Sequence, residues 1–518
     1  MAGPAPGLSV YPGSLDLLST LTNLAREDRI RDAVQLLEAY SFPSYNARTY
    51  GGAKGDGTDA TTAIQAALTD GAGGHVVIPP GSYGVSGTLN VPADTTVTLQ
   101  GATITALASL ANGIFMPNGE GITFQGRYTY NGNAKATDFI HGSPGAHYLR
   151  HTAYGTVSGI PTPNYWINLT GCNHPTVAGK LKTIDSPAVR IDRSSHVEVI
   201  GLRPGPYSLT LGNNPVIAVE DFIANGGVDF VEDVLILGCH VDGGSQLAGY
   251  AGIVVGQAFG GGTHLENARV IGCSVKNTTG GSDGIDFVQV DNGAIVACHV
   301  IGTNNGIDVA GCNFIGVSAS TAKNCRSAGF QCGDITVAFQ TNVVTYTDCI
   351  AIACGIGGQV DFTAAGFVIL APAATSTNLV TLANCIGYNA GNAAMKYGVG
   401  LGKGAGGTMS TISVTGGFML GSTLGFLDSS GLNVVAFRQV GGINPQAGAA
   451  VVGAFPWTNT NPYDVLLTFV ANAAGSTPTV SGKAMSAVPA NQVGTVIVPA
   501  GAAISFNNAP ASAAGYGL

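Results

Sequence analysis

Apolar and polar residues alternate in short recurring runs along most of this 518-residue chain. Between Gly252 and Leu401 one four-residue phrase returns six times: glycine, an apolar residue, a variable residue and a second residue of apolar character. A period of two is that of a β-strand, whose successive side chains point to opposite faces. We therefore predict a short strand at each copy. The copies are residues 252–255, 284–287, 306–309, 329–332, 366–369 and 398–401.

A second phrase, an apolar run that ends in cysteine, lies between copies of the first. Its cysteines follow one another at intervals of 24 to 36 residues. Repeats of this length predict a solenoid, in which each coil contacts only its neighbours. We predict an all-β protein built as a parallel β-helix, with the cysteines stacked inside as small, free hydrophobic side chains. They are Cys239, Cys273, Cys298, Cys325, Cys349 and Cys385.

The pattern changes at both ends of the chain and once within it. Residues 1–45 form a tail with a predicted helix over 15–40, which has no internal glycine or proline. The β-helix is predicted over 46–445. Between 125 and 189 its repeat breaks, which predicts a large loop or insertion standing off the helix. In the last segment, 446–518, residues 462–470 and 494–501 predict antiparallel strands of a small C-terminal β-domain.

Residues 50–104 carry a family resemblance. Residues 50–59 read YGGAKGDGTD, 62–68 read TAIQAAL and 73–83 read GGHVVIPPGSY. This resembles the opening segment of the pectate-lyase-like superfamily of right-handed parallel β-helices, which is common in bacteriophage tailspikes and in some polysaccharide lyases and hydrolases. Ala60 departs from the second acidic residue usual there. The resemblance implies a right-handed coil, a homotrimer, and attachment to other phage tail proteins through the N-terminal region.

The same segment has a structural explanation. Thr58 or Asp59 can cap a helix that runs to about Thr69, and Gly71 can end it. Such a helix would cover the open first coil, whose strand edges and apolar core are otherwise exposed. We predict that this motif caps the rod and has no catalytic role.

Composition excludes several classes of function. A formal net charge of −9 argues against nucleic acid as a partner and favours neutral glycans. No run of about 18 apolar residues is present, so we predict no membrane span. The N-terminus has no secretory signal pattern, so we expect synthesis in the host cytoplasm, free thiols, and export within a virion.

Paired carboxylates are the best lead to catalysis. Asp286 and Asp308 hold the variable position of neighbouring copies and should stack about 4.8 Å apart; Asp283 adds a third acid. Two close carboxylates can serve as acid and base in glycoside hydrolysis. The run at 281–286 resembles the acidic motif of polygalacturonase-like hydrolases, but that family's Gly-His-Gly and Arg-Ile-Lys motifs are missing. The alternative is a set of solvated positions or turn caps. Whether the protein is an enzyme stays open, and a hydrolase is favoured over a lyase.

Several side chains are candidates for binding sugar. Aromatic rings pack on the apolar faces of sugars, and polar groups bind their hydroxyls. The aromatics of 125–189 can equally form a small core beneath a long loop. Gln331 continues the aspartate column, and a glycine-rich loop carrying a histidine and a glutamate could overhang it. No metal or cofactor is predicted. The binding candidates are Tyr128, Tyr130, Tyr165, Trp166, His264, Glu266 and Gln331.

Together these features predict a phage tailspike or minor tail protein that binds host surface polysaccharide, with depolymerisation left open. Two alternatives remain. One is a receptor-binding or structural tail-tip protein without catalysis. The other is a bacterial pectate-lyase-like lyase or hydrolase.

Overall fold

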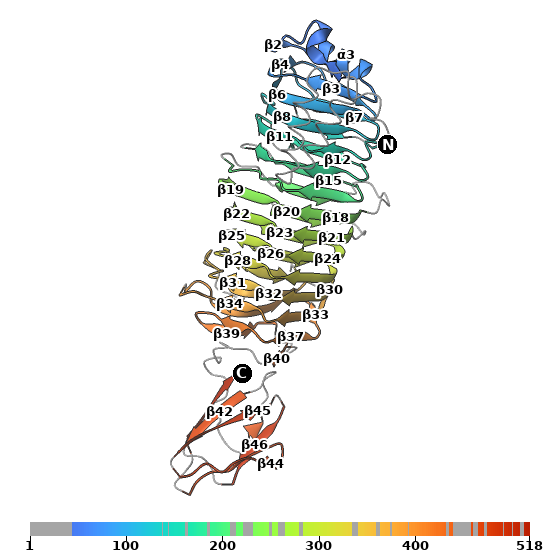
Figure 1. Cartoon of the computed structure of the whole chain (residues 1–518). Helices are drawn as coiled ribbons and strands as arrows, with labels where there is room; N and C mark the ends of the chain where they lie inside the picture. Colours follow the sequence, from blue (N-terminus) through green and yellow to red (C-terminus); the bar gives the residue numbers. More distant parts are fainter. Residues whose placement is uncertain are drawn as a thin grey trace, which may run out of the picture.

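The computed structural model shows a long rod of stacked coils followed by a smaller β-structure (Figure 1). Every pairing between the described strands of the rod is parallel, which confirms the predicted parallel β-helix. The structure describes residues 44–517 except 137, 143, 161–163, 184–186, 208–213, 221–230, 248–250, 257–264, 279–282, 334–339, 359–362, 373–374, 392, 431–434, 439–456, 459–464, 471–473, 491, 500 and 508–511. The predicted helix over 15–40 lies outside the described residues.

Three parallel sheets run along the rod, and we name them A, B and C. Sheet A contains β1 (Ser44–Asn46), β2 (Asp56–Asp59), β3 (His75–Ile78), β4 (Gly81–Val85), β6 (Thr96–Ala106), β8 (Thr123–Asn131), β10 (Arg150–His151), β11 (Tyr154–Ser158), β13 (Thr176–Ala178), β14 (Leu181–Thr183), β16 (Val197–Ile200), β18 (Glu232–Leu237), β21 (Leu265–Ile271), β24 (Val290–Val296), β27 (Asn313–Ser318), β30 (Thr341–Thr347), β33 (Ser376–Ala383), β36 (Thr408–Met409), β37 (Ile412–Thr415) and β40 (Val435–Arg438). Sheet B contains β5 (Leu89–Pro92), β7 (Phe115–Asn118), β9 (Ile140–Gly142), β12 (Ile167–Thr170), β15 (Val189–Asp192), β17 (Ile217–Glu220), β20 (Ala251–Gly256), β23 (Asp283–Val288), β26 (Ile307–Ala310), β29 (Phe330–Cys332), β32 (Ala365–Ala371), β35 (Tyr397–Lys403) and β39 (Leu424–Asp428). Sheet C contains β19 (His240–Leu247), β22 (Ser274–Thr278), β25 (His299–Ile301), β28 (Thr321–Lys323), β31 (Ile350–Ile352), β34 (Ile386–Tyr388) and β38 (Phe418–Leu420).

The repeated glycine phrase forms consecutive strands of sheet B. Ile285 pairs with Ile307, and Ile307 with Phe330, so the apolar residue after each glycine stacks in register inside the rod. The glycine is required by crowding, because a Cβ at Gly306 would lie 2.6 Å from the Cβ of Ala322 in sheet C. The phrase therefore marks a place where sheets B and C pack closely against each other.

The predicted cysteine column exists, with one correction. Residues with left-handed backbone, such as Gly272 and Ala297, immediately precede its members. Each thiol then donates to backbone carbonyls, as Cys298 does to Val296 of its own coil and Val270 of the coil before. Cys325 is not a member; it lies beside Cys354 in a second column. Its predicted place is taken by a serine, because the position needs a small donor. The column is Cys239, Cys273, Cys298, Ser320, Cys349 and Cys385.

The predicted insertion at 125–189 is wrong. Strands β8, β11 and β14 pair in register in sheet A, and β9, β12 and β15 do so in sheet B. The segment is therefore part of the rod. It departs from the repeat because large aromatic side chains, among them Phe139 and Trp166, fill these coils in place of Ile, Val and Cys.

The N-terminal end of the rod is covered by α3 (Thr61–Asp70), as predicted from the opening segment. Its buried residues, including Ile64 and Leu68, belong to the interior core. The N-cap of α3 is Ala60, not Thr58 or Asp59 as predicted, and it makes no side-chain capping bond; Oδ1 of Asp59 instead accepts from the backbone N of Thr61 at 3.0 Å. Gly71 ends the helix, as predicted. A short 3-10 helix, η1 (Ala47–Tyr50), precedes it. Among the described residues no helix is long and apolar enough to cross a bilayer.

The C-terminal strands pair antiparallel, as predicted. One sheet joins β42 (Val465–Val470) to β45 (Val493–Val498) and β47 (Ser512–Gly517). The other contains β41 (Trp457–Thr458), β43 (Pro478–Val480), β44 (Lys483–Ala484) and β46 (Ala503–Phe506). A separate apolar cluster that includes Val498 and Ile504 stabilises them.

Candidate functional site

The predicted stacking of the two aspartates is confirmed. Asp286 of β23 pairs with Asp308 of β26 on the outer face of sheet B. Both side chains are buried, with exposed fractions of 3% and 5%. Gln331, next in the column, donates from Nε2 to Oδ2 of Asp308 at 2.8 Å. Val254 and Val368, before and after the three in the same column, are buried too. The column is therefore enclosed and does not line an open groove.

Asp283 caps a turn of the next coil. Its Oδ1 accepts from the backbone N of Asn305 at 2.9 Å and from Nδ2 of Asn304 at 3.4 Å. This is the structural alternative considered for an aspartate beside glycine. The contacts connect two coils at the start of β23.

The predicted sugar-binding aromatics lie inside the rod. Tyr130 and Trp166 are fully buried, and Tyr128 and Tyr165 are 4% exposed. The ring of Tyr128 stacks on Phe139 with centroids 4.5 Å apart. Their assignment to substrate is wrong, because stacked coils of this part of the rod need large apolar side chains to fill the interior.

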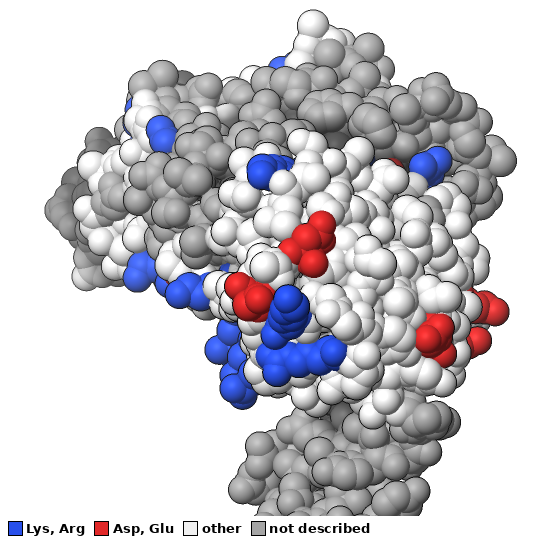
Figure 2. Space-filling view, turned by 90° about the horizontal axis from the view of Figure 1, so that it is seen from above, with Lys and Arg blue, Asp and Glu red and all other residues white. Residues whose placement is uncertain are grey.

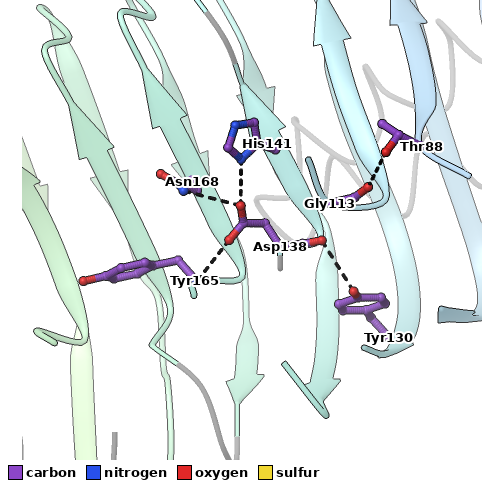
Figure 3. A network of polar contacts seen from close by, with 7 residues as sticks. All are labelled: Thr88, Gly113, Tyr130, Asp138, His141, Tyr165 and Asn168. Carbon is purple, nitrogen blue, oxygen red and sulfur yellow. Dashed lines mark hydrogen bonds and ion pairs between the residues drawn. The ribbon is translucent and has the colours of Figure 1, made fainter. Parts of the chain in front are cut away.

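A buried carboxylate organises the same coils on the side of sheet B (Figure 3). Asp138 is 1% exposed. Its Oδ2 lies 2.7 Å from Nδ1 of His141 and accepts from Nδ2 of Asn168 at 3.4 Å, while its Oδ1 accepts from the backbone N of Tyr165 at 3.1 Å. His141 pairs with Asn168 in register. The network holds two neighbouring coils together and fixes the orientation of the imidazole.

Burial also changes the ionisation of a second carboxyl group of sheet B, that of Glu220 on β17. It raises the pKa of Glu220, an effect that the guanidinium of Arg190 opposes; Nε of Arg190 lies 3.4 Å from Oε2 of Glu220. Asp192 pairs with Glu220 and adds repulsion that raises the pKa further. Within the described residues, no three Cys, His, Asp or Glu side chains gather as a metal site would require.

Glu266 lies on a different face from the aspartate column. It is exposed on β21 of sheet A and pairs with Asp291 of β24. From Asp291 onward a ladder of amides continues: Asn313 donates to Asp291 at 2.7 Å, and Asn342 donates to Asn313 at 2.8 Å. Glu266 therefore does not overhang Asp286 as predicted. His264 lies outside the described residues.

Sequence reasoning missed a groove on the outer face of sheet A, which we call the basic groove. It is a depression of about 530 Å³ bordered by β8, β11, β14 and the turn after β16. The guanidinium of Arg127 lies over the ring of Tyr154, 5.9 Å from its centroid. None of the described residues that line the groove is acidic. Its exposed charged, aromatic and hydroxyl side chains are Arg127, Lys180, Lys182, Arg203, Tyr154, Thr129 and Thr156, whereas Tyr128, which also borders it, is buried.

A second depression, of about 610 Å³, lies over other strands of sheet A, and we call it the histidine groove. At its edge Tyr148 stacks on His174 with centroids 4.7 Å apart and ring planes 4° apart. His174 packs on His196 at 4.3 Å, and Nε2 of His196 lies 3.6 Å from Oδ2 of Asp233. All four residues have left-handed backbone, with φ between 53° and 57°. Arg150, Thr176, Glu198, Val197, Leu235 and Arg269 complete the lining.

Only part of these grooves could have been found in the sequence. Tyr148 and Tyr154 fall within the aromatic-rich segment, yet nothing in their spacing separates them from the tyrosines that point inward. The lysines and arginines of the basic groove, Arg127, Lys180, Lys182 and Arg203, lie on three of four successive coils, at sequence intervals of 53, 2 and 21 residues. Their gathering follows from the register of the strands.

Comparisons with known proteins agree with the fold. Residues 44–176 match the family model described as rhamnogalacturonase A/epimerase, pectate lyase-like, which confirms the resemblance seen in the opening segment. A comparison with curated proteins found no match.

The solved structures similar to the chain include the following three. The A-module of a mannuronan C-5 epimerase from Azotobacter vinelandii is 14% identical, with a TM-score of 0.41, over 79% of this chain and 100% of that one. Tailspike protein 3 of bacteriophage CBA120 is 11% identical, with a TM-score of 0.48, over 80% and 64%. A gene product 12 fragment of bacteriophage Phi29 is 14% identical, with a TM-score of 0.43, over 80% and 73%. At these identities the likeness concerns the fold alone.

Proposed function

We propose that this chain is a polysaccharide-binding β-helix protein whose binding surface is the outer face of sheet A. The observation that carries the proposal is the exposure of Tyr154 in the basic groove and Tyr148 in the histidine groove, at 45% and 52%. Each ring is surrounded by hydroxyl and charged side chains. An open aromatic face packs against the C–H face of a sugar, and neighbouring polar groups bind its hydroxyls.

The shape of the rod supports a linear polymer as ligand. Neighbouring strands of a sheet lie about 4.8 Å apart, so a chain laid along the rod meets the same position on successive coils. Residues of both grooves lie on such columns, since Thr176 pairs with Arg150 and Thr156 with Thr129. A polymer could therefore contact several coils at once.

Binding to a panel of bacterial surface polysaccharides tests the proposal. Tyr148→Ala and Tyr154→Ala should each raise Kd by about tenfold, the effect of losing one aromatic contact. Tyr388→Ala is the matched control, because Tyr388 is 41% exposed on sheet C and lines neither groove. Unchanged affinity in both groove variants would overturn the assignment of this surface.

We further propose that the protein acts on a phage tail as a homotrimer, with residues 1–45 for attachment or as a trimer neck and 446–518 as a C-terminal domain that caps the rod and joins subunits. The resemblance of residues 50–104 to the opening of tail proteins supports this placement. Light scattering should give the mass of three chains, and antibodies to the protein should label the tails of intact particles. A monomer, or unlabelled particles, would contradict it.

Cleavage of the glycan is a second proposal, with Asp283, Asp286 and Asp308 as its candidates. The in-register pairing of Asp286 and Asp308 supports it. Their burial and the turn-capping contacts of Asp283 favour a structural role, so we place binding ahead of cleavage. If the protein shortens its polysaccharide, Asp286→Asn and Asp308→Asn should abolish the shortening while binding persists. Undiminished cleavage in both variants would exclude this pair.

A further inference from the structure

We infer that the basic groove binds an acidic polysaccharide, one whose negative groups recur along a linear chain. This inference rests on the proposed function and adds the charge of the ligand. It also departs from the expectation of a neutral glycan, which followed from the charge of the whole chain.

The first argument is the local charge. Four exposed cations, Arg127, Lys180, Lys182 and Arg203, line one depression, although the whole chain carries a formal charge of −9. No acidic residue is among the described lining residues, and the ion pairs of the described part of the chain involve none of the four cations. A concave surface lined by one sign of charge concentrates ligands of the opposite sign. Viewed along the rod, a group of Lys and Arg side chains lies on one side, with acidic side chains beside part of it (Figure 2).

The second argument is the arrangement of these cations along the rod. Tyr154 pairs with Arg127, and Lys180 holds the corresponding position one coil further. Arg127 and Lys180 are thus two strand spacings apart, about 10 Å. A second column runs beside the first on the same three coils. It consists of Thr129, Thr156 and Lys182. The groove offers positive charge at intervals along the rod and hydroxyl groups between, as a repeating acidic sugar chain would require.

The third argument is the ring of Tyr154 between the two cations. Its exposed fraction of 45% leaves ring surface for a sugar, while Arg127 packs over the ring from the preceding coil. Arginine and lysine form charge-assisted hydrogen bonds with carboxylate, sulfate or phosphate oxygens. A neutral sugar would use the ring and leave the cations without an ionic partner.

The histidine groove offers a contrast on the same face. It combines Arg150 and Arg269 with Glu198 and Asp233. A groove lined by both signs does not select for a polyanion. The preference for acidic sugars is therefore assigned to the basic groove alone.

The test compares polymers that differ in charge, using the full chain. Alginate supplies carboxylates and a glycerol teichoic acid supplies phosphodiesters; carboxyl-reduced alginate and dextran are the neutral counterparts. We expect at least one polyanion to bind, its neutral counterparts to bind more weakly, and affinity to fall as salt rises. Lys180→Gln with Lys182→Gln should raise Kd by about tenfold and reduce the salt dependence.

Lys323→Gln with Lys403→Gln is the matched control, because it removes two exposed charges on sheets C and B and lies outside the groove. Its Kd should stay within about twofold of wild type. The inference fails if neither polyanion binds, if neutral and acidic forms bind alike, or if duplex DNA binds the groove as tightly. Binding of dextran that needs Tyr154 but not the lysines would overturn the inference and leave the proposed function standing. Failure of every polysaccharide to bind would overturn both.

Discussion

Nε2 of Gln331 donates a 2.8 Å hydrogen bond to Oδ2 of Asp308, and the two side chains belong to neighbouring coils of sheet B. Both are buried, so the amide helps to compensate the desolvation of the carboxyl group. Gln331→Leu should therefore lower the free energy of unfolding by about 1–3 kcal/mol, measured by urea denaturation. Gln340→Leu is the control, because Gln340 is exposed and bonds to the exposed edge of the amide ladder. Equal losses in the two variants would contradict this account.

The cysteine column predicts which substitutions the rod tolerates. Ser320 holds a column position and donates to the carbonyl of Ser318 at 2.9 Å, as Cys298 donates to Val296. Cys298→Ser should then change the free energy of unfolding by less than about 1 kcal/mol, whereas Cys298→Leu should cost about 1–3 kcal/mol through overpacking. Thermal and urea unfolding of the two variants measure the difference. A serine variant as unstable as the leucine variant would show that the donor is not what the position requires.

The cysteines should also be unreactive in the folded protein. All ten are free and buried, and desolvation raises the pKa of Cys312 well above its usual value. Because a reagent must reach the sulfur, burial should leave all ten unlabelled until the chain unfolds, including Cys273, whose pKa is lowered by hydrogen bonds with the thiols of Cys239 and Cys298. Counting labelled thiols with and without denaturant checks this. Rapid labelling of the native protein would contradict the enclosed column.

A buried histidine should make stability depend on pH. His151 is fully buried, contacts the hydroxyl of Tyr128 at 3.2 Å, and desolvation lowers its pKa from 6.5 to about 4. Its native form is neutral, so the unfolded chain takes up a proton first as pH falls. Stability should be full above pH 6.5 and decline towards pH 4, by about 3 kcal/mol for this group. Urea unfolding at several pH values should show a smaller decline in His151→Gln than in wild type; equal declines would exclude His151 as the source.

Alanine substitution of two aromatic residues in the segment 125–189 should affect different properties, stability in one case and binding in the other. Trp166 is fully buried in the core, so Trp166→Ala should cost about 3–5 kcal/mol of stability. Tyr154 is on the surface, so Tyr154→Ala should leave the unfolding free energy within about 0.5 kcal/mol of wild type and act on binding. Denaturation and binding measured on both variants separate the roles. A stable Trp166→Ala protein that only loses binding would restore the original assignment of the aromatics to substrate.

The sequence by itself was enough to predict that the chain winds into repeated coils of short parallel strands. The glycine phrase recurs because one position in each coil has no room for a side chain: a Cβ at Gly306 would lie too close to Ala322. Such a requirement can be recognised directly in the sequence. The stacking of Asp286 on Asp308 followed from the same repeat, since residues at equal places in consecutive coils must be neighbours. The capping helix could also be predicted, because Asp59 and Gly71 act on their own local backbone.

Only the tertiary structure decided which side chains face solvent and which gather. The tyrosines at 128, 130, 148 and 154 look alike in the sequence, but the first two point into the rod and the last two out of it. Whether an outward position such as Asp286 stays open depends on what covers that face, which no repeat encodes. The basic groove joins Arg127 to Arg203 across several coils of unequal length. The positive charge of this groove depends on which residues the strand register brings together, and the packing of the whole rod sets that register.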